Sequence, residues 1–343
     1  MSVFNREYFK YELLKANGEF IKEIDSVENS TVTYSSLSRL KQMATINVAV
    51  GVLAKIDVNN RIRIKHVLNG VETTIGTFMI TTPVQNINTL FKSVSIECYS
   101  TLWLLNADKT TSRLVIGIGT NVVNEVKRML ADYGVQVLID DSVKSTSVSR
   151  EWEIGTPILD VCNDLLQSIN YTSLYVDENG NFISKPYELP SDRFIDFEYR
   201  EDDPLNIVEN EVVSTLDYFD IPNVFVKYVN NPDTPELIAV YENVNPQSPT
   251  STVNRPRNVH SEEVSDVSDV QTLTDMCKRD LETFTSTYHR VTLLTGINPE
   301  HGYMNTVYIN LNGLSGKFTE TDWTMECVTG GTMTHELRES VVI

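Results

Sequence analysis

The stretch RIRIKHVLNGVETTIGTFMITTP, from Arg61 to Pro83, decides the fold class of the first third of the chain. Asn69 and Gly70 at its centre form the dipeptide that turns a two-residue β-hairpin, because both residues accept the positive φ angles of that turn. The strand-like residues on either side therefore predict two antiparallel strands.

The neighbouring segments continue this pattern. YFKYELLKANGEFIKEI, from Tyr8 to Ile24, alternates aromatic and polar positions around a second hairpin dipeptide, Asn17–Gly18. Another strand pattern follows in KSVSIECYSTLWLL, which begins at Lys92. Residues 1–105 are therefore expected to form an N-terminal domain, an antiparallel β-barrel or sandwich.

Residues 106–190 are expected to form a small α+β module. A first helix is predicted from Asn121 to Tyr133, and a second helix begins after Thr156, its expected N-cap. A hairpin follows from Tyr171 to Tyr187, turned at Asn179–Gly180.

Residues 191–343 are expected to form a C-terminal β-rich domain with one helix near residues 269–284. The predicted strands are NVFVKYV (223–229), ELIAVYENV (236–244), RVTLLTG (290–296), NTVYINL (305–311) and WTMECV (323–328). The segment from Asn245 to Ser261 carries three prolines and few apolar residues, which indicates an exposed loop.

The stretch RLVIGIGTNVVNEVKRML, from Arg113 to Leu130, resembles the beginning of a dinucleotide-binding unit. That fingerprint needs Gly or Ala at its third position for close helix packing, and Val122 stands there. The chain then continues into a hairpin and a β-rich half instead of further parallel strands. Gly117 and Gly119 are therefore interpreted as residues of a tight strand-to-helix turn.

Composition restricts the classes of function. A chain of 343 residues predicts two or three domains, and its net charge of −19 argues against a protein that grips nucleic acid or anionic lipid. The four cysteines lie far apart, which favours reduced core residues: Cys98, Cys162, Cys277 and Cys327. The polar start and the lack of a long apolar run predict neither a signal peptide nor a membrane helix, and therefore a cytoplasmic place of synthesis and folding.

No catalytic, cofactor-binding or metal site is predicted, and no cofactor is expected. HELRE, from His335 to Glu339, lacks the second histidine of a zinc-binding helix. A hydrolase would need paired carboxylates, and none can be assembled from the acids of the module, Glu151, Glu153, Asp160 and Asp177. A carbohydrate-binding protein could use three tryptophans as stacking platforms, although core packing is favoured for each: Trp103, Trp152 and Trp323.

Two blocks carry a resemblance to a known family. WEIGTPILDVCNDLLQSINYTSLYVDENGNFISKPY, from Trp152 to Tyr187, resembles the baseplate hub proteins of contractile phage tails and phage-tail-like bacteriocins. The block from Gly302 to Ser340, which ends in GGTMTHELRES, is similar to the closing β segment of those hubs. The order of modules agrees over most of the chain.

The resemblance implies an α+β, β-rich fold with two tail-tube-like antiparallel β-barrel domains and the small α+β module between them. It implies a non-enzymatic homotrimeric ring that adapts the tail tube to the central spike, with other baseplate or LysM-containing proteins as further partners. Such a component is assembled in the bacterial cytoplasm and becomes part of the tail particle. The surplus of acids would then either line the channel of the ring or be spread over its outside. The alternative is a tail-associated peptidoglycan hydrolase or a carbohydrate-binding tail protein.

Overall fold

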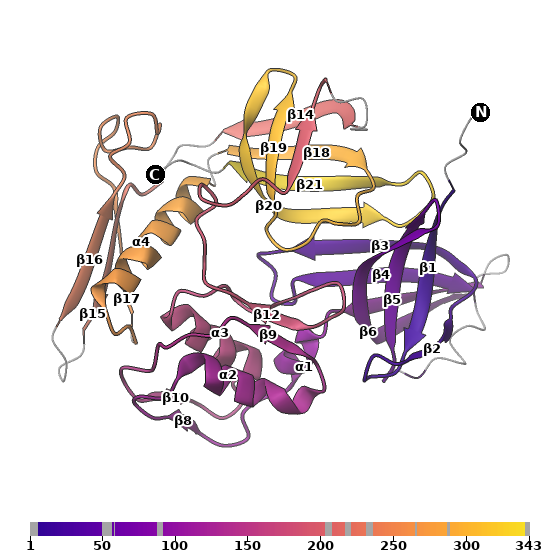
Figure 1. Ribbon diagram of the computed structural model, residues 1–343, viewed down its shortest axis with the longest axis horizontal. Coiled ribbons are helices and arrows are strands. Elements are labelled where there is room, and N and C mark those ends of the chain that lie inside the picture. Colours follow the sequence, from indigo (N-terminus) through magenta and orange to yellow (C-terminus); the bar gives the residue numbers. More distant parts are fainter. Residues whose placement is uncertain are drawn as a thin grey trace.

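The computed structural model describes residues 6–49, 57, 59–87, 92–202, 208–216, 221–230, 236–264, 266–286 and 289–339. Within these ranges strands outweigh helices, and one large sheet dominates the molecule (Figure 1). The expected α+β, β-rich class is confirmed. None of the helices in the described part of the chain is long and apolar enough to cross a membrane.

The large sheet contains 13 described strands, most of them on one hydrogen-bonded path. In order along that path they are β14 (Val208–Leu216), β18 (His289–Gly296), β21 (Thr332–Glu339), β20 (Leu314–Glu326), β3 (Val27–Ser35), β4 (Gln42–Ala49), β7 (Lys92–Tyr99), β6 (Val71–Ile87), β5 (Arg61–Leu68), β1 (Glu7–Leu14) and β2 (Phe20–Glu23). Off this path, β19 (Thr306–Leu311) pairs with β20, and β13 (Phe197–Arg200) pairs with β19.

The predicted hairpins are present at both Asn-Gly dipeptides of the N-terminal part. Asn69 and Gly70 have φ angles of 54° and 86° and join β5 to β6, as the twist of a two-residue hairpin requires. Gly18, at φ 85°, lies in the turn from β1 to β2. Local turn chemistry therefore decides these strand pairs.

Strands β3 and β20 join the N-terminal and C-terminal halves into one sheet. They pair antiparallel, with Tyr34 opposite Trp323 and Val32 opposite Met325 (Figure 1). The core of the N-terminal strands is consequently completed by Trp323, Met325, Cys327 and Met333 from the other end of the chain. The division of the chain at residues 105 and 190 stays a prediction, as do the two separate barrels.

The middle of the chain packs around its own apolar core. Its elements are α1 (Leu102–Ala107), β8 (Leu114–Ile116), α2 (Val122–Leu130), the 3₁₀ turn η2 (Ala131–Tyr133), β9 (Val137–Ile139), β10 (Arg150–Trp152), α3 (Ile158–Ser168), β11 (Tyr175–Val176) and β12 (Phe182–Ser184). The expectation that Thr156 is the N-cap of the second helix is wrong by one residue. Pro157 has the extended backbone of the cap, while the Thr156 hydroxyl donates to the Glu153 carbonyl.

A third unit consists of α4 (Val270–Thr285) packed on one face of a small sheet (Figure 1). The sheet has the order β16 (Leu237–Glu242), β15 (Val224–Val229), β17 (Val259–Glu263). The prediction of a loop through Ser261 is wrong at its end, because β17 pairs in parallel with β15 although its sequence is mostly polar. Main-chain pairing, not apolar burial, forms this edge strand. Asp269 caps α4 by accepting from the Thr272 amide.

Candidate functional site

One face of the large sheet is covered by the apolar cores, and the opposite face is uncovered over β18, β21, β20, β3, β4 and β7. We call this surface the open face. Its threonines are Thr31, Thr33, Thr45, Thr292, Thr324, Thr332 and Thr334, and its charged residues are Glu97, Arg290, Asp322, Glu326, Glu336 and Arg338. Met43 and Leu294 are larger apolar side chains on it.

Side chains of the open face interact across the strands. Thr324 lies opposite both Thr33 and Thr334, and the Thr324 hydroxyl oxygen is 3.4 Å from that of Thr33. The Thr292 hydroxyl donates to Glu336 Oε1 at 3.0 Å. Such cross-strand pairs stabilise a sheet whose second face is solvated. The result is a surface of hydroxyls and carboxylates that continues across the junction of β3 and β20.

A buried network of two histidines and one carboxylate lies on the covered side of the C-terminal half. The carboxylate of Glu320 is hydrogen-bonded to both histidines. His301 Nδ1 is 2.7 Å from Glu320 Oε2, and His335 Nδ1 is 2.5 Å from Glu320 Oε1. The other ring nitrogen of each histidine is hydrogen-bonded to a hydroxyl group. His301 Nε2 is 3.0 Å from the Tyr199 hydroxyl, and His335 Nε2 is 2.8 Å from the Thr295 hydroxyl. All three ionisable side chains are fully buried.

Burial opposes the charge of Glu320, but the hydrogen bonds from both histidines outweigh it and lower the pKa of its carboxyl group. Burial lowers the pKa of His335. The three side chains are close enough to hold a metal ion, yet the nitrogen–oxygen separations are those of hydrogen bonds. The segment HELRE, from His335 to Glu339, belongs to strand β21. The sequence did not indicate the buried partners of His335, because His301 and Glu320 lie on other segments of the chain.

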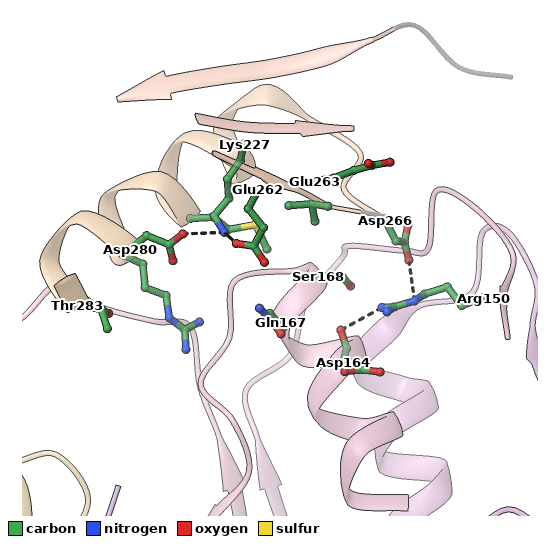
Figure 2. A pocket seen from close by; sticks show the side chains of 13 residues that line it. Arg150, Asp164, Gln167, Ser168, Lys227, Glu262, Glu263, Asp266, Asp280 and Thr283 are labelled. Atoms are coloured by element: carbon green, nitrogen blue, oxygen red, sulfur yellow. Dashed lines mark hydrogen bonds and ion pairs between the residues drawn. The ribbon is translucent and has the colours of Figure 1, made fainter. Parts of the chain in front are cut away.

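A crevice of about 380 Å³ separates α3 from the unit of α4 and the small sheet (Figure 2). Lys227 lies at one side, with its Nζ 2.5 Å from Glu262 Oε2 and 2.7 Å from Asp280 Oδ2. On the other side Asp266 accepts from the amide and the hydroxyl of Ser147, at 2.8 and 2.7 Å. Because Ser147 belongs to the module and Asp266 lies just before α4, these hydrogen bonds connect the module to the α4 unit.

The glycine-rich turn has a structural role. Gly119 has φ +80°, and its amide donates to the Thr146 carbonyl at 2.9 Å. The Thr146 hydroxyl donates to the Gly117 carbonyl at 2.8 Å, and Asn121 caps α2 through the Asn124 amide. Thr146 therefore holds the tight turn between β8 and α2 in which Gly117 and Gly119 lie.

The acids considered for a hydrolase are engaged at separate places. Glu151 pairs with Arg113, Asp160 pairs with Arg39, and Asp177 accepts from turn amides. Within the part of the chain that the structure describes, none of these acids belongs to a group of three ligand-type side chains.

The three tryptophans differ in exposure. Trp323 is 1% exposed and stacks on Tyr34, with 5.6 Å between the ring centroids. Trp152 is 8% exposed, and its indole N–H donates to Asp164 at 2.9 Å. Core packing is confirmed for these two residues. Trp103 is 37% exposed.

The sequence matches no family model and no curated protein. Solved structures share its fold. The tail protein from Neisseria meningitidis MC58 has a TM-score of 0.69 at 12% identity, covering 97% of both chains. The 43 kDa tail protein of prophage MuSo2 from Shewanella oneidensis has a TM-score of 0.65 at 9% identity, covering 97% of this chain and 98% of its own.

A third similar structure is an Escherichia coli component of the type VI secretion system, described as structurally similar to the bacteriophage T4 tail proteins gp27 and gp5. It has a TM-score of 0.55 at 8% identity and covers 92% of this chain and 74% of its own. The likeness to the first two structures extends over both halves of the sheet, the module and the α4 unit. It is therefore a likeness of the whole architecture.

Proposed function

We propose that this protein, which has the fold of phage tail proteins, is a structural hub subunit of a contractile tail or contractile injection particle. Three copies form a closed ring that adapts the tail tube to the central spike. Other baseplate or LysM-containing proteins bind around the ring, and the particle is assembled in the bacterial cytoplasm. The role is non-enzymatic.

The observation that carries this proposal is the extent of the fold match. Two tail proteins cover this chain and are covered by it almost from end to end. A grafted binding or catalytic domain would leave a large part of one chain unmatched. The match therefore supports a role for the complete subunit, as in a component built to assemble.

The open face supports a place for the large sheet along the channel of the ring. Its charged side chains are mostly acidic, with Glu97, Glu326 and Glu336 exposed and Arg290 and Arg338 as basic side chains. A wall of like charge repels a polyanion that moves past it, whereas clustered basic residues would retain it. Few apolar anchors interrupt this face, so it is poorly suited to hold a partner tightly. We therefore place the open face toward the lumen.

The pairing of β3 with β20 explains how one subunit could contribute two halves to the ring. Each subunit contributes strands from both halves to one uninterrupted surface. Three subunits of two halves each would then match the sixfold symmetry of a tail tube. The module and the α4 unit would then lie beside one end of this surface and contact the baseplate.

Electron cryo-microscopy of intact particles tests the proposal. The expected density shows three copies between the last tube ring and the spike, with the open face along the channel. Six copies or a single copy at that place would contradict the hub role. Three copies with the open face turned outward would contradict only its assignment to the lumen.

A further inference from the structure

A second recess, of about 270 Å³, lies where β20 and β21 meet the C-terminal end of α4 and the module. Figure 1 shows this end of α4 beside the sheet. Three basic side chains line the recess, Lys41, Arg279 and Arg338, together with one carboxyl group, Glu282. In a chain of net charge −19, this local excess of positive charge is unexpected.

Two of the basic groups, Lys41 and Arg279, donate to main-chain carbonyl groups. Lys41, which is 9% exposed, donates from Nζ to the Ser36 carbonyl at 2.5 Å. Arg279 donates to the Tyr171 carbonyl at 3.0 Å and stacks over the Tyr187 ring. Among the described residues, no carboxylate lies within ion-pair distance, 4 Å, of Lys41, Arg279 or Arg338.

Glu282 supplies only part of one negative charge to the recess near pH 7. Its carboxyl group is 4% exposed and accepts a hydrogen bond from the Tyr187 hydroxyl at 3.0 Å. Burial raises its pKa to about 7, so that a large share of it is neutral near that pH. Burial and the nearby Arg279 lower the pKa of Lys41 to about 8, as expected for an ammonium group without a counter-charge.

The recess also presents an unused hydroxyl group. Ser36 is 6% exposed, and its Oγ has no hydrogen-bond partner among the described residues. A buried polar atom without a partner is costly, and a bound group that accepts its hydrogen bond would remove that cost. Guanidinium, ammonium and hydroxyl donors around one small space are the donor set that recognises carboxylate or phosphate oxygens.

We propose that the recess lined by Ser36, Lys41, Arg279 and Arg338 binds an oxyanion, supplied either as a free phosphate-type ion or as the acidic side chain of a neighbouring chain. The bound anion bridges the sheet, the module and α4, because each of these parts contributes to the recess. It thereby fixes their relative positions. Arg338 lies on the same side of β21 as Glu336, so the recess adjoins the open face. The proposal does not depend on the hub role.

Calorimetric titration and thermal melting of the purified chain at pH 7 and constant ionic strength test the proposal. The probes are inorganic phosphate and N-acetylglutamate amide, with chloride as the reference ion. Arg338→Gln is the main variant. Arg128→Gln is the matched control, because Arg128 is an exposed arginine of α2 that does not line the recess. Ser36→Ala removes the hydroxyl with little change in volume.

We expect saturable binding of at least one probe to the native chain and to Arg128→Gln, with affinity at least tenfold lower in Arg338→Gln and reduced in Ser36→Ala. Binding of phosphate identifies a free ion as a sufficient ligand, and binding of N-acetylglutamate amide alone identifies an acidic side chain. Absence of saturable binding, or equal binding by Arg338→Gln with its native circular dichroism spectrum, would overturn the proposal.

Discussion

Thr33 of β3 lies directly opposite Thr324 of β20, with 3.4 Å between their hydroxyl oxygen atoms. This pair marks the junction at which the first strands of the chain and the last strands become one sheet. Behind it, Tyr34 and Trp323 stack in the core. The open face and the apolar core therefore both cross the junction, and its integrity determines whether the two halves act as one body.

Replacement of Trp323 by alanine tests the core at the junction. The side chain is fully buried, and its indole N–H donates to the Gly302 carbonyl at 3.2 Å. The loss of buried area and the resulting cavity should lower the free energy of unfolding by about 3–5 kcal/mol. Urea denaturation measures this change. Trp103→Ala, at a more exposed position, should cost clearly less; equal losses would contradict the central place of Trp323.

Charge reversal tests the open face. Glu97, Glu326 and Glu336 are exposed, so their joint replacement by lysine should shift the melting temperature by only a few degrees. Particles that carry this variant should assemble but deliver DNA less efficiently, because a basic wall retains a polyanion.

The control for charge reversal is a chain with three lysines elsewhere on the surface, at the exposed residues Glu178, Glu263 and Glu300. Infectivity per assembled particle is the measurement. Equal infectivity of the two triple variants would refute the place of the open face in the lumen.

The buried histidine network should make the fold sensitive to acid. The pKa of His335 lies below its usual 6.5 in the folded chain, so the unfolded chain binds more protons as the pH falls. The corresponding stability is present above pH 6.5 and is lost as the pH falls through the folded pKa of His335. Glu320, whose pKa is lowered from 4.5, adds a further loss below pH 4.5.

Urea denaturation between pH 8 and pH 4 measures the effect. His335→Gln should reduce the slope of stability against pH below 6.5. The matched replacement His260→Gln, at a partly exposed residue of β17, should leave the slope as it is in the native chain. An unchanged slope in His335→Gln would be inconsistent with this account.

Glu282 should affect the pH dependence of stability in the opposite direction to His335 and Glu320. Burial raises its pKa from 4.5 to about 7, so the folded chain binds the additional proton. Its contribution is fully present below pH 4.5 and is lost as the pH rises through 7, a change on the order of 3 kcal/mol. The free energy of unfolding of Glu282→Gln, relative to that of the native chain, should therefore be higher at pH 8 than at pH 5. Glu300→Gln, at an exposed position, serves as the control and should show no such difference.

The sequence by itself determined the elements whose cause is local. Asn69–Gly70 turns a hairpin because its own backbone accepts the positive φ angles, and Gly134, at φ 65°, ends the helical segment that follows Asn121. The helix near residues 269–284 was predictable from its spaced apolar residues, since one face had to be buried. The sequence also showed that the dinucleotide fingerprint is incomplete, because Val122 stands where it needs Gly or Ala.

Only the tertiary structure decided the contacts between distant segments. The pairing of Thr33 with Thr324 and the meeting of His301, Glu320 and His335 depend on which strands become neighbours, and strand order leaves no local mark in a sequence. Strand β17 was missed for the same reason, because its polar residues are held by main-chain bonds to β15. The excess positive charge around Arg338 also arises only when sheet, module and α4 come together, since electrostatic interaction depends on distance in space and not along the chain.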